Sequence, residues 1–376
     1  MEVTSEPGLI RHFTGHKAKI TDVVFDNNTN QIASSSFDGT VMVWNFHQVA
    51  RCMRFSTHTD KVNSIAWSPT ADLIASCSND KTARVWQPKI KSSVGEMFCH
   101  SNVVRSVDFD PDGEILLTGS DDKSLKLWRV SNKKFITSFT GHTNWIRSAK
   151  FSPSGNLIAS CGDDKTIRIF DVTSGTCIHT FQERQGMGRY IAWHPDSSIV
   201  AVALTCNRVK IFDVQQRKLI QLYAVHSQKV NSISFHPSGN FLITASDDTT
   251  IKILDLLEGR PIYTITGHLD GVTAVSFSQD GNYFATGGQD RQLMIWKTNF
   301  CDVDSPNHST SLEMSGITPL LPESDDALVE NAHQLKRIGN LEGKNKNNQD
   351  ADQSVFVDPR NTEAYKNKIR FSEYDS

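Results

Sequence analysis

Histidine, serine or threonine, and aspartate recur together along this chain of 376 residues. In the first set, His16 is followed by Ser34 and Asp38. Such a set could turn a hydroxyl into a nucleophile, with the aspartate orienting the imidazole. A catalytic triad occurs once, however, beside a pocket and an oxyanion hole. Because this set recurs up to six times at equal spacing, we interpret it as structural and predict no enzyme and no catalytic residues.

The spacing of these sets is 42 residues. Arg184 stands in the one place where a histidine is missing, and the histidines that keep the spacing are His16, His58, His100, His142, His226 and His268. Within one copy, residues 141–171 alternate apolar and polar positions, and turn residues interrupt them. This pattern is typical of short antiparallel strands. Seven copies of about 40–45 residues predict an all-β fold, a seven-bladed β-propeller.

The two ends of the repeat complement each other. Residues 9–13, followed by Thr-Gly-His, match the fourth-strand end of later copies, and the seventh copy stops after its third strand near Lys297. We therefore predict that the N-terminal strand pairs into the last blade and closes the ring, because closure removes open sheet edges. The expected organisation is a flexible stretch at 1–8, a propeller at 9–299 and a polar, mostly disordered tail at 300–376. A short helix is expected near 325–338.

The repeat resembles the WD40 family over roughly residues 9 to 299. In that family the loop histidine, a second-strand hydroxyl, the turn aspartate and a third-strand tryptophan form a hydrogen-bonded tetrad. The resemblance implies four complete tetrads, in blades one, two, three and seven, made by His16, Ser34, Asp38 and Trp44; His58, Ser76, Asp80 and Trp86; His100, Thr118, Asp122 and Trp128; and His268, Thr286, Asp290 and Trp296. Blades four and six carry Phe170 and Leu254 in place of the indole. The tetrad positions of blade five hold Arg184, Val202, Cys206 and Phe212.

Partners of WD40 proteins often dock on the face that carries the loop histidines. The matching positions place Arg105, Arg147 and Arg189 on three adjacent blades, with Trp145 and Met187 between them. Arginine and tryptophan are enriched at binding hot spots, and an arginine cluster favours an acidic partner. The protein-binding site that we expect comprises Lys61, Arg105, Trp145, Arg147, Met187, Arg189 and Lys229.

The arginines have a second interpretation, because Asp121 and Asp163 occupy equivalent positions on the same face and could pair with them. Charge elsewhere is uneven. Residues 301–376 carry a net charge of −6, which leaves +3 for the rest of a chain whose net charge is −3. A mildly basic ring with an acidic tail favours protein partners over nucleic acid.

Several classes of site and location are not indicated. No run of about 18 apolar residues is present, so we expect no membrane span, and no secretory signal is visible. No Cys-x-x-Cys pair, metalloprotease His-Glu-x-x-His motif or glycine-rich phosphate loop is present, so we expect no metal and no cofactor. We expect a monomer unless another segment mediates self-association.

Some stretches are idiosyncratic rather than generic to the repeat. They include residues 11–16, 85–89, 144–147, 236–240, 252–260 with Leu254, and 295–300. They are similar to the centriolar WD40 family known as proteome of centriole protein 1. That resemblance implies a scaffold at centrioles and basal bodies, in the cytoplasm and cytoskeleton, that associates with the microtubule wall and supports stable centrioles and cilia. It makes centriolar proteins and tubulin, with its acidic tails, the natural partners. Family members carry a C-terminal coiled coil, whereas no sustained heptad follows residue 300.

Two other functions stay open. WD40 substrate receptors of ubiquitin ligases often carry an arginine two residues after the aspartate of a Trp-Asp pair. The matching positions here hold His47, Lys89, Ser131, Thr173, Gln215, Leu257 and Asn299. A generic WD40 scaffold in signalling or RNA processing is the third interpretation.

Overall fold

The computed structural model describes residues 6–46, 52–70, 73–89, 95–300 and 356–357. The chain divides into two units, Met1–Phe300 with Gln353–Ser376, and Cys301–Asp352. All described residues belong to the first unit, and their regular structure is entirely β. The helix expected near 325–338 and most of the polar tail lie outside the described residues.

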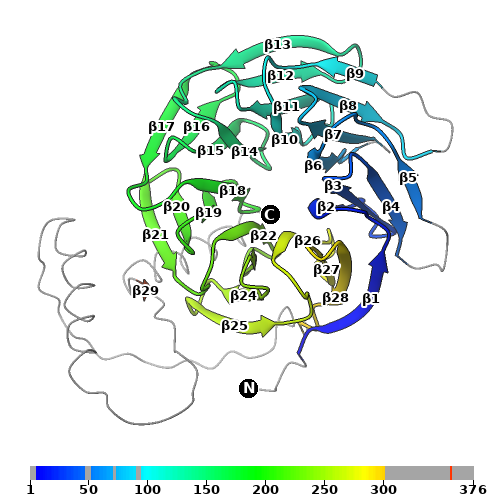
Figure 1. Ribbon diagram of the computed structural model, residues 1–376. Helices are drawn as coiled ribbons and strands as arrows, with labels where there is room; N and C mark the ends of the chain where they lie inside the picture. The colour runs from blue at the N-terminus through cyan, green and yellow to red at the C-terminus, as the bar shows by residue number, and fades with distance from the viewer. Residues whose placement is uncertain (1–5, 47–51, 71–72, 90–94, 301–355, 358–376) are drawn as a thin grey trace, which may run out of the picture. The chain divides into compact units, whose positions relative to one another are not determined.

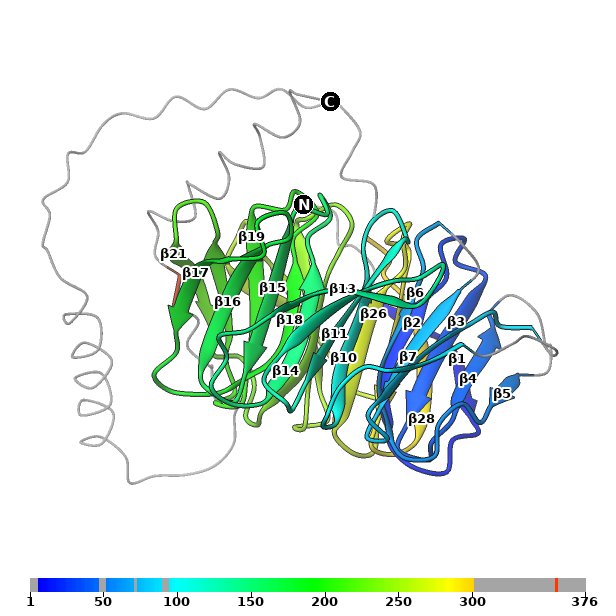
Figure 2. The same cartoon turned by 90° about the horizontal axis from the view of Figure 1, so that it is seen from above.

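Seven antiparallel sheets are arranged around a common axis, and in Figure 1 each appears as one blade of a ring. The strands of the first four blades are β2 (Ile20–Phe25), β3 (Gln31–Ser36), β4 (Val41–Asn45) and β5 (Met53–Phe55); β6 (Val62–Trp67), β7 (Ile74–Ser78), β8 (Thr82–Trp86) and β9 (Gly95–Phe98); β10 (Val104–Phe109), β11 (Ile115–Ser120), β12 (Leu125–Arg129) and β13 (Lys134–Phe139); and β14 (Ile146–Phe151), β15 (Leu157–Gly162), β16 (Thr166–Asp171) and β17 (Cys177–Gln182). Figure 2 views these sheets side on.

The remaining blades follow the same order. Their strands are β18 (Gly188–Trp193), β19 (Ile199–Leu204), β20 (Val209–Asp213) and β21 (Lys218–Tyr223); β22 (Val230–Phe235), β23 (Phe241–Ser246), β24 (Ile251–Asp255) and β25 (Arg260–Ile265); and β26 (Val272–Phe277), β27 (Tyr283–Gly288), β28 (Gln292–Lys297) and β1 (Gly8–Thr14). The prediction of a seven-bladed propeller is confirmed.

The N-terminal strand closes the ring, as predicted. β1 pairs antiparallel with β28, from Gly8 opposite Lys297 to Thr14 opposite Gln292. Phe13 of β1 then packs on Trp44 of blade one, with ring centroids 5.1 Å apart. The last blade is thus completed by the first strand of the chain, and both ends of the repeat lose an exposed edge.

The hydrophobic core lies between blades. Seven clusters of buried residues are present, and each joins two adjacent sheets. One cluster packs Val41 and Val43 of blade one against Ile65 and Trp86 of blade two. Another packs Ile20 of blade one against Ile295 of blade seven, across the point of closure. A single blade cannot bury both of its faces, so the repeat is stable only as a closed set.

The turn between the second and third strands has the same backbone in every blade. The residue after the lattice position of the aspartate has a positive φ in all seven copies, which are Gly39, Lys81, Lys123, Lys165, Asn207, Thr249 and Arg291. Glycine tolerates this left-handed conformation, whereas a β-branched residue does not. Thr249, with a φ of 69°, is therefore the most strained of the set.

Blade five has a fifth strand. β29 (Phe356–Val357) pairs antiparallel with β21, opposite Leu222 and Gln221. The repeat pattern does not predict this strand, because its two residues lie in the polar tail, which we expected to be mostly disordered.

Candidate functional site

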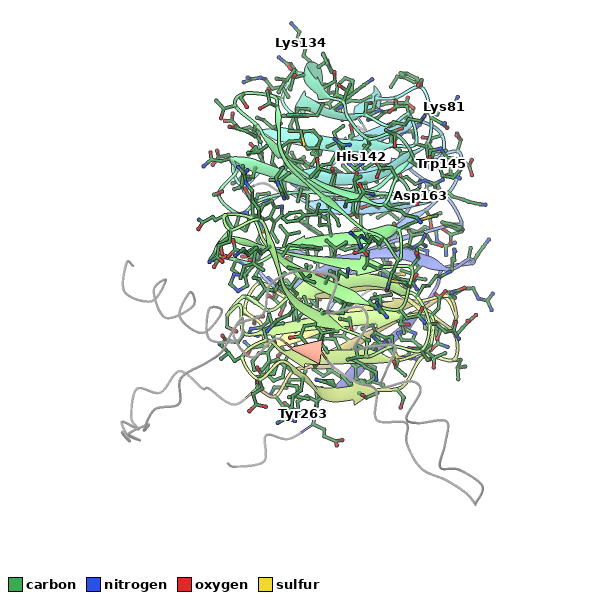
Figure 3. The ribbon with its side chains drawn as sticks, turned by 90° about the vertical axis from the view of Figure 1, so that its left-hand side faces the viewer. Lys81, Lys134, His142, Trp145, Asp163 and Tyr263 are labelled. Atoms are coloured by element: carbon green, nitrogen blue, oxygen red, sulfur yellow. The ribbon has the colours of Figure 1, made fainter. Side chains whose placement is uncertain are left out.

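In every blade except blade five, one end carries both the loop histidine and the turn aspartate; we call this side of the ring the histidine face. The loop before the first strand and the turn after the second strand are joined there by a backbone hydrogen bond. Examples are Asp121 N–H to the Val103 carbonyl and Asp163 N–H to the Trp145 carbonyl, both 2.9 Å. In Figure 3, Lys81, Trp145 and Asp163 gather on this side, whereas Lys134 lies at the outer rim.

Blade three illustrates the tetrads. The Trp128 indole donates to Thr118 Oγ1 at 3.0 Å, Thr118 Oγ1 lies 2.8 Å from His100 Nε2, and His100 Nδ1 lies 2.8 Å from Asp122. Because the carboxylate can only accept, Nδ1 carries the proton and Nε2 accepts from the hydroxyl. The chain of donors therefore runs from Trp128 through Thr118 and His100 to Asp122.

The other three tetrads have the same connections. In blades one, two and seven the histidine Nδ1 lies 3.2, 2.8 and 3.0 Å from the aspartate, and the histidine Nε2 lies 2.8, 2.9 and 2.9 Å from the hydroxyl. The indole donates to that hydroxyl at 2.8, 3.5 and 3.0 Å. These contacts are made by His16, Ser34, Asp38 and Trp44; by His58, Ser76, Asp80 and Trp86; and by His268, Thr286, Asp290 and Trp296.

The hydroxyls of these sets are closed to any substrate. Ser34, Ser76, Thr118 and Thr286 are each 0% exposed. A triad nucleophile must stand beside an open pocket, so the order of hydrogen bonds resembles a triad while the burial does not. The hydrogen bonds of each set hold the loop that carries the histidine to the strands of its blade. We call each His–Ser/Thr–Asp set a strut.

Blades four and six keep the polar part of the set. His142 lies 2.8 Å from Asp164 and 2.7 Å from Ser160, whereas the indole position is filled by Phe170, which packs on Phe139. In blade six His226 joins Asp248 and Thr244, each at 2.8 Å.

Blade five replaces the set with an ion pair. Glu183, which is 3% exposed, lies 2.8 Å from Lys210 Nζ. Arg184 is exposed, and Cys206 lies half-buried in the turn. The loop of this blade is therefore held by charge rather than by a histidine.

The strut aspartates are held in their ionised form. Burial alone raises the pKa of Asp164, but hydrogen bonds from His142 and Thr166 outweigh it and hold that pKa well below its ordinary value. The same balance lowers the pKa of the equivalent carboxyls in the other blades with histidines, which are Asp38, Asp80, Asp122, Asp248 and Asp290.

Two of the three predicted arginines are held by carboxylates of their own blade. Arg105 makes a bidentate pair with Asp121, with nitrogen–oxygen distances of 2.7 to 3.1 Å. Arg147 pairs with Asp163 at 2.7 and 2.5 Å. The second interpretation, in which the arginines pair with aspartates on the same face, thus holds for these two residues. Arg189 differs, because blade five has Thr205 at the position of that aspartate.

The lysines of the predicted site divide in the same way. Lys229 pairs with Asp247 at 2.8 Å. Lys61 instead lies over the ring of Phe37, with its ammonium 5.0 Å from the centroid. Lys19, which we did not include in the predicted site, lies over the same ring at 4.2 Å. The sequence feature that could have identified Lys19 is Phe37, which stands at the position where other blades have an aspartate.

Three large apolar side chains are exposed on the histidine face. Trp145 is 41% exposed, Met187 is 38% exposed, and Leu269, in the loop after His268, is 83% exposed. The Arg147 guanidinium lies over the indole of Trp145, 5.2 Å from the centroid. Because Asp163 holds that guanidinium in place, the guanidinium in turn restricts the movement of the Trp145 indole.

Some positions equivalent to the arginines serve the ring instead. Thr21 donates to the Val62 carbonyl at 2.9 Å, and Asn63 donates to the Val104 carbonyl at 2.7 Å. Each bond links one blade to the next. These side chains are therefore committed to the contact between blades.

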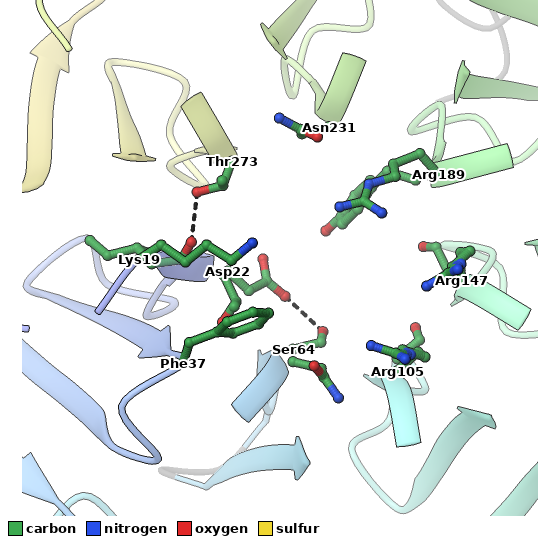
Figure 4. Close-up of a pocket in the computed structure, with 15 residues that line it drawn as sticks. Lys19, Asp22, Phe37, Ser64, Arg105, Arg147, Arg189, Asn231 and Thr273 are labelled. Atoms are coloured by element: carbon green, nitrogen blue, oxygen red, sulfur yellow. Dashed lines mark hydrogen bonds between the residues drawn. The ribbon is translucent and has the colours of Figure 1, made fainter. Parts of the chain in front are cut away.

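A cavity opens at the centre of the histidine face, where the first strands of the blades converge; we call it the channel mouth. Its volume is about 120 Å³, and its lining includes Lys19, Phe37, Arg105, Arg147, Arg189 and Thr273 (Figure 4). Pockets for drug-sized ligands are larger, about 300–1,000 Å³. The channel mouth therefore fits a side chain better than a whole cofactor.

The buried carboxyl of Asp22 lines the channel mouth. Asp22 accepts hydrogen bonds from Ser64 Oγ at 2.7 Å and from the backbone N–H groups of Val23 and Ile65. Burial raises the pKa of Asp22, against these hydrogen bonds. Lys150 pairs with Asp108 at 3.1 Å, and these two side chains are 20% and 19% exposed.

In the part of the chain that the structure describes, no group of three or more His, Cys, Asp or Glu side chains is placed to hold a metal ion. Within those same residues, no helix is long and apolar enough to cross a membrane.

The sequence matches known proteins in two ways. The profile of the family described as "WD domain, G-beta repeat" matches residues 8–45, 50–87, 91–129, 133–171, 217–255 and 259–297. These segments cover more than half of the chain. Most of blade five falls between two of them, which agrees with its lack of a tetrad.

Curated relatives match over shorter stretches. A POC1 centriolar protein homolog of Drosophila melanogaster is 53% identical over 51 residues, which is 14% of this chain and 13% of that relative. The POC1 centriolar protein homolog A of Xenopus laevis is 51% identical over 52 residues, 14% and 12% of the two chains. The homolog B of Danio rerio is 48% identical over 53 residues, 14% and 11%. The matches thus span about an eighth of the length of these relatives.

The repeat profile, the seven antiparallel blades and the recurring His–Ser/Thr–Asp struts agree with one another. The chain belongs to the WD40 family, whose unit is the WD domain, G-beta repeat.

Proposed function

We propose that this protein is a non-enzymatic protein-interaction scaffold of centrioles and basal bodies, with the histidine face as its docking surface. The centriolar part rests on the similarity to relatives named POC1 centriolar protein homologs, over about an eighth of their length. By this proposal the protein works in the cytoskeleton, associates with the microtubule wall and supports centriole stability and cilium formation.

The observation that carries the docking role is the exposure of Trp145 and Met187 beside Arg147 and Arg189. Hot spots of interfaces are enriched in Trp and Arg, and a side chain that is held rigid before the partner binds loses less entropy on binding. Trp145 meets this condition, because Arg147 lies over its ring and is itself paired with Asp163. The neighbouring blade adds Met187, a residue type whose flexible side chain adapts to apolar partners.

Proximity labelling tests the location. The full chain, fused to a biotin ligase, is expressed in dividing ciliated cells, and biotinylated proteins are identified by mass spectrometry. We expect centriole-wall proteins and tubulin to be enriched. Enrichment of a ubiquitin-ligase adaptor, without centriolar neighbours, would overturn the proposal in favour of a substrate receptor.

A variant pair tests the docking face. Trp145→Ala should lower recruitment to centrioles, whereas Ile178→Ala should not. Ile178 lies on the outer strand β17 and is 42% exposed, close to the 41% of Trp145. Both variants should unfold at the wild-type temperature, because both side chains are already solvent-exposed. Equal recruitment of the two variants would mean that the partner docks elsewhere on the ring.

A further inference from the structure

The cations of the histidine face follow a simple pattern. Blades three, four and six have an aspartate before the turn, and each aspartate holds a cation of its own blade: Arg105 with Asp121, Arg147 with Asp163, and Lys229 with Asp247. Blades one, two and five have Phe37, Asn79 and Thr205 at that position. Their cations, Lys19, Lys61 and Arg189, have no carboxylate partner among the described residues.

Arg189 is the most enclosed of these cations. Burial lowers its pKa, and the charge of Arg147 lowers it further. The nearby Asp247 is already occupied by Lys229 at 2.8 Å, by Asn231 at 2.5 Å and by Gln289 at 3.0 Å. Asp247 and Asp163 act on Arg189 only at longer range. Among the described residues, the Arg189 guanidinium therefore lines the channel mouth without a directly bound carboxylate (Figure 4).

Lys19 adds a second open charge across the cavity. Burial lowers the pKa of Lys19, and the charges of Arg189 and Lys229 lower it further. Its ammonium rests on Phe37, which offers a ring face but no full negative charge. An anion between Lys19 and Arg189 would relieve the repulsion between the two cations.

We propose that the channel mouth binds the carboxylate side chain of an acidic peptide segment, with Arg189 as its principal partner and Lys19 opposite. This proposal rests on the docking role of the histidine face. The chain itself displays the geometry twice, because Asp121 and Asp163 reach the equivalent arginines of blades three and four at 2.5 to 3.1 Å. An external carboxylate would take the place that Thr205 leaves empty in blade five.

The experiment measures binding of a fluorescein-labelled glutamate-rich peptide to the purified full chain by fluorescence anisotropy. The wild type should bind this peptide, less tightly as salt increases, and should not bind the same peptide with glutamine in place of glutamate. Arg189→Gln should weaken binding by about tenfold or more, because a hydrogen-bonded charge is lost. Arg129→Gln is the control. It removes an exposed arginine at the C-terminal end of β12, away from the histidine face, and should leave peptide binding unchanged.

A second variant keeps Arg189 and introduces a carboxylate at position 205, where blade five lacks the aspartate of blades three and four. Thr205→Asp should pair with Arg189 as Asp163 pairs with Arg147, raise the unfolding temperature and weaken peptide binding. Thr205→Asn, a neutral control of the same shape, should retain binding. Undiminished binding by both Arg189→Gln and Thr205→Asp would overturn the assignment. Much tighter binding of a phosphoserine version of the peptide would replace the carboxylate with a phosphate.

The two proposals can fail separately. Peptide binding that depends on Arg189, in a protein that labels no centriolar neighbours, supports the carboxylate site and contradicts the centriolar role. Centriolar labelling that survives Arg189→Gln and Thr205→Asp, in a protein that does not bind the acidic peptide, does the reverse.

Discussion

The side-chain hydroxyl of Thr273 donates a hydrogen bond of 2.6 Å to the backbone carbonyl of Ile20, 253 residues away in sequence. The equivalent side chain of blade one, Thr21, makes the same bond to Val62 of blade two at 2.9 Å. The last and first blades are therefore joined by the same kind of bond as the first and second blades.

Thr273→Val tests this bond. The variant keeps the shape of the side chain and removes the donor, so we expect the free energy of unfolding in urea to fall by about 1 kcal/mol. Thr264→Val, on the exposed outer strand β25, is the control and should change it by less than about 0.5 kcal/mol. An equal effect of the two substitutions would mean that the hydroxyl of Thr273 does not stabilise the closure.

Deletion of residues 1–14 tests closure by the N-terminal strand. The deletion removes β1 and uncovers the edge of β28, and it also removes Phe13 from Trp44. Because an open edge pairs with other chains, we expect soluble aggregates in size-exclusion chromatography and a lower unfolding temperature. A monodisperse truncation with an unchanged unfolding temperature would contradict closure by β1.

Asp122→Ala should destabilise the protein more than Cys206→Ala. Asp122 accepts hydrogen bonds from His100, Ser101 and Ser124, and its loss leaves buried donors unpaired. We expect a loss of about 2–3 kcal/mol. Cys206 has no such network, and its replacement should cost about 1 kcal/mol or less. Chemical denaturation of both variants checks the difference, and equal losses would show that the struts add no stability.

The strut aspartates predict a pH dependence. The folded-state pKa of Asp164 lies below its unfolded value of about 3.9. Its contribution to stability is therefore fully present above that unfolded value and is lost as the pH falls through the folded pKa. Asp164→Asn removes the titration, so the stability gap between wild type and variant should be largest at pH 5–7 and should narrow below about pH 4. Urea unfolding at stepped pH measures the gap, and a gap that widens in acid would reverse the sign that we expect.

Thr249→Gly should stabilise blade six. The left-handed φ of Thr249 costs about 1–2 kcal/mol for a residue with a Cβ, whereas glycine loses about 0.4–1 kcal/mol through its freer unfolded chain. We expect a net gain of about 0.5 kcal/mol in the free energy of unfolding. Gly39, which holds the equivalent turn of blade one, is the internal precedent. A loss of stability would mean that the threonine side chain makes a compensating contact.

The repeat was readable from the sequence because each blade is built from neighbouring residues. His100, Thr118, Asp122 and Trp128 all lie within one copy, at positions where the resemblance to the WD40 family implied the hydrogen bonds that the structure contains. The closure by β1 was readable for a similar reason, because one end of the repeat lacks the strand that the other end has to spare. The same repetition argued against a triad, and burial supplies the physical reason.

Whether each cation is paired with a carboxylate, in contrast, was decided by the tertiary structure. The sequence places Arg105, Arg147 and Arg189 in equivalent positions and offers aspartates nearby. It does not say which guanidinium is held by a carboxylate and which is left facing the channel mouth. That outcome depends on distances and burial across several blades, such as the bonds by which Gln289 and Asn231 occupy Asp247. Period and pattern are properties of the chain, whereas charge neutralisation depends on the packing that brings distant copies around one cavity.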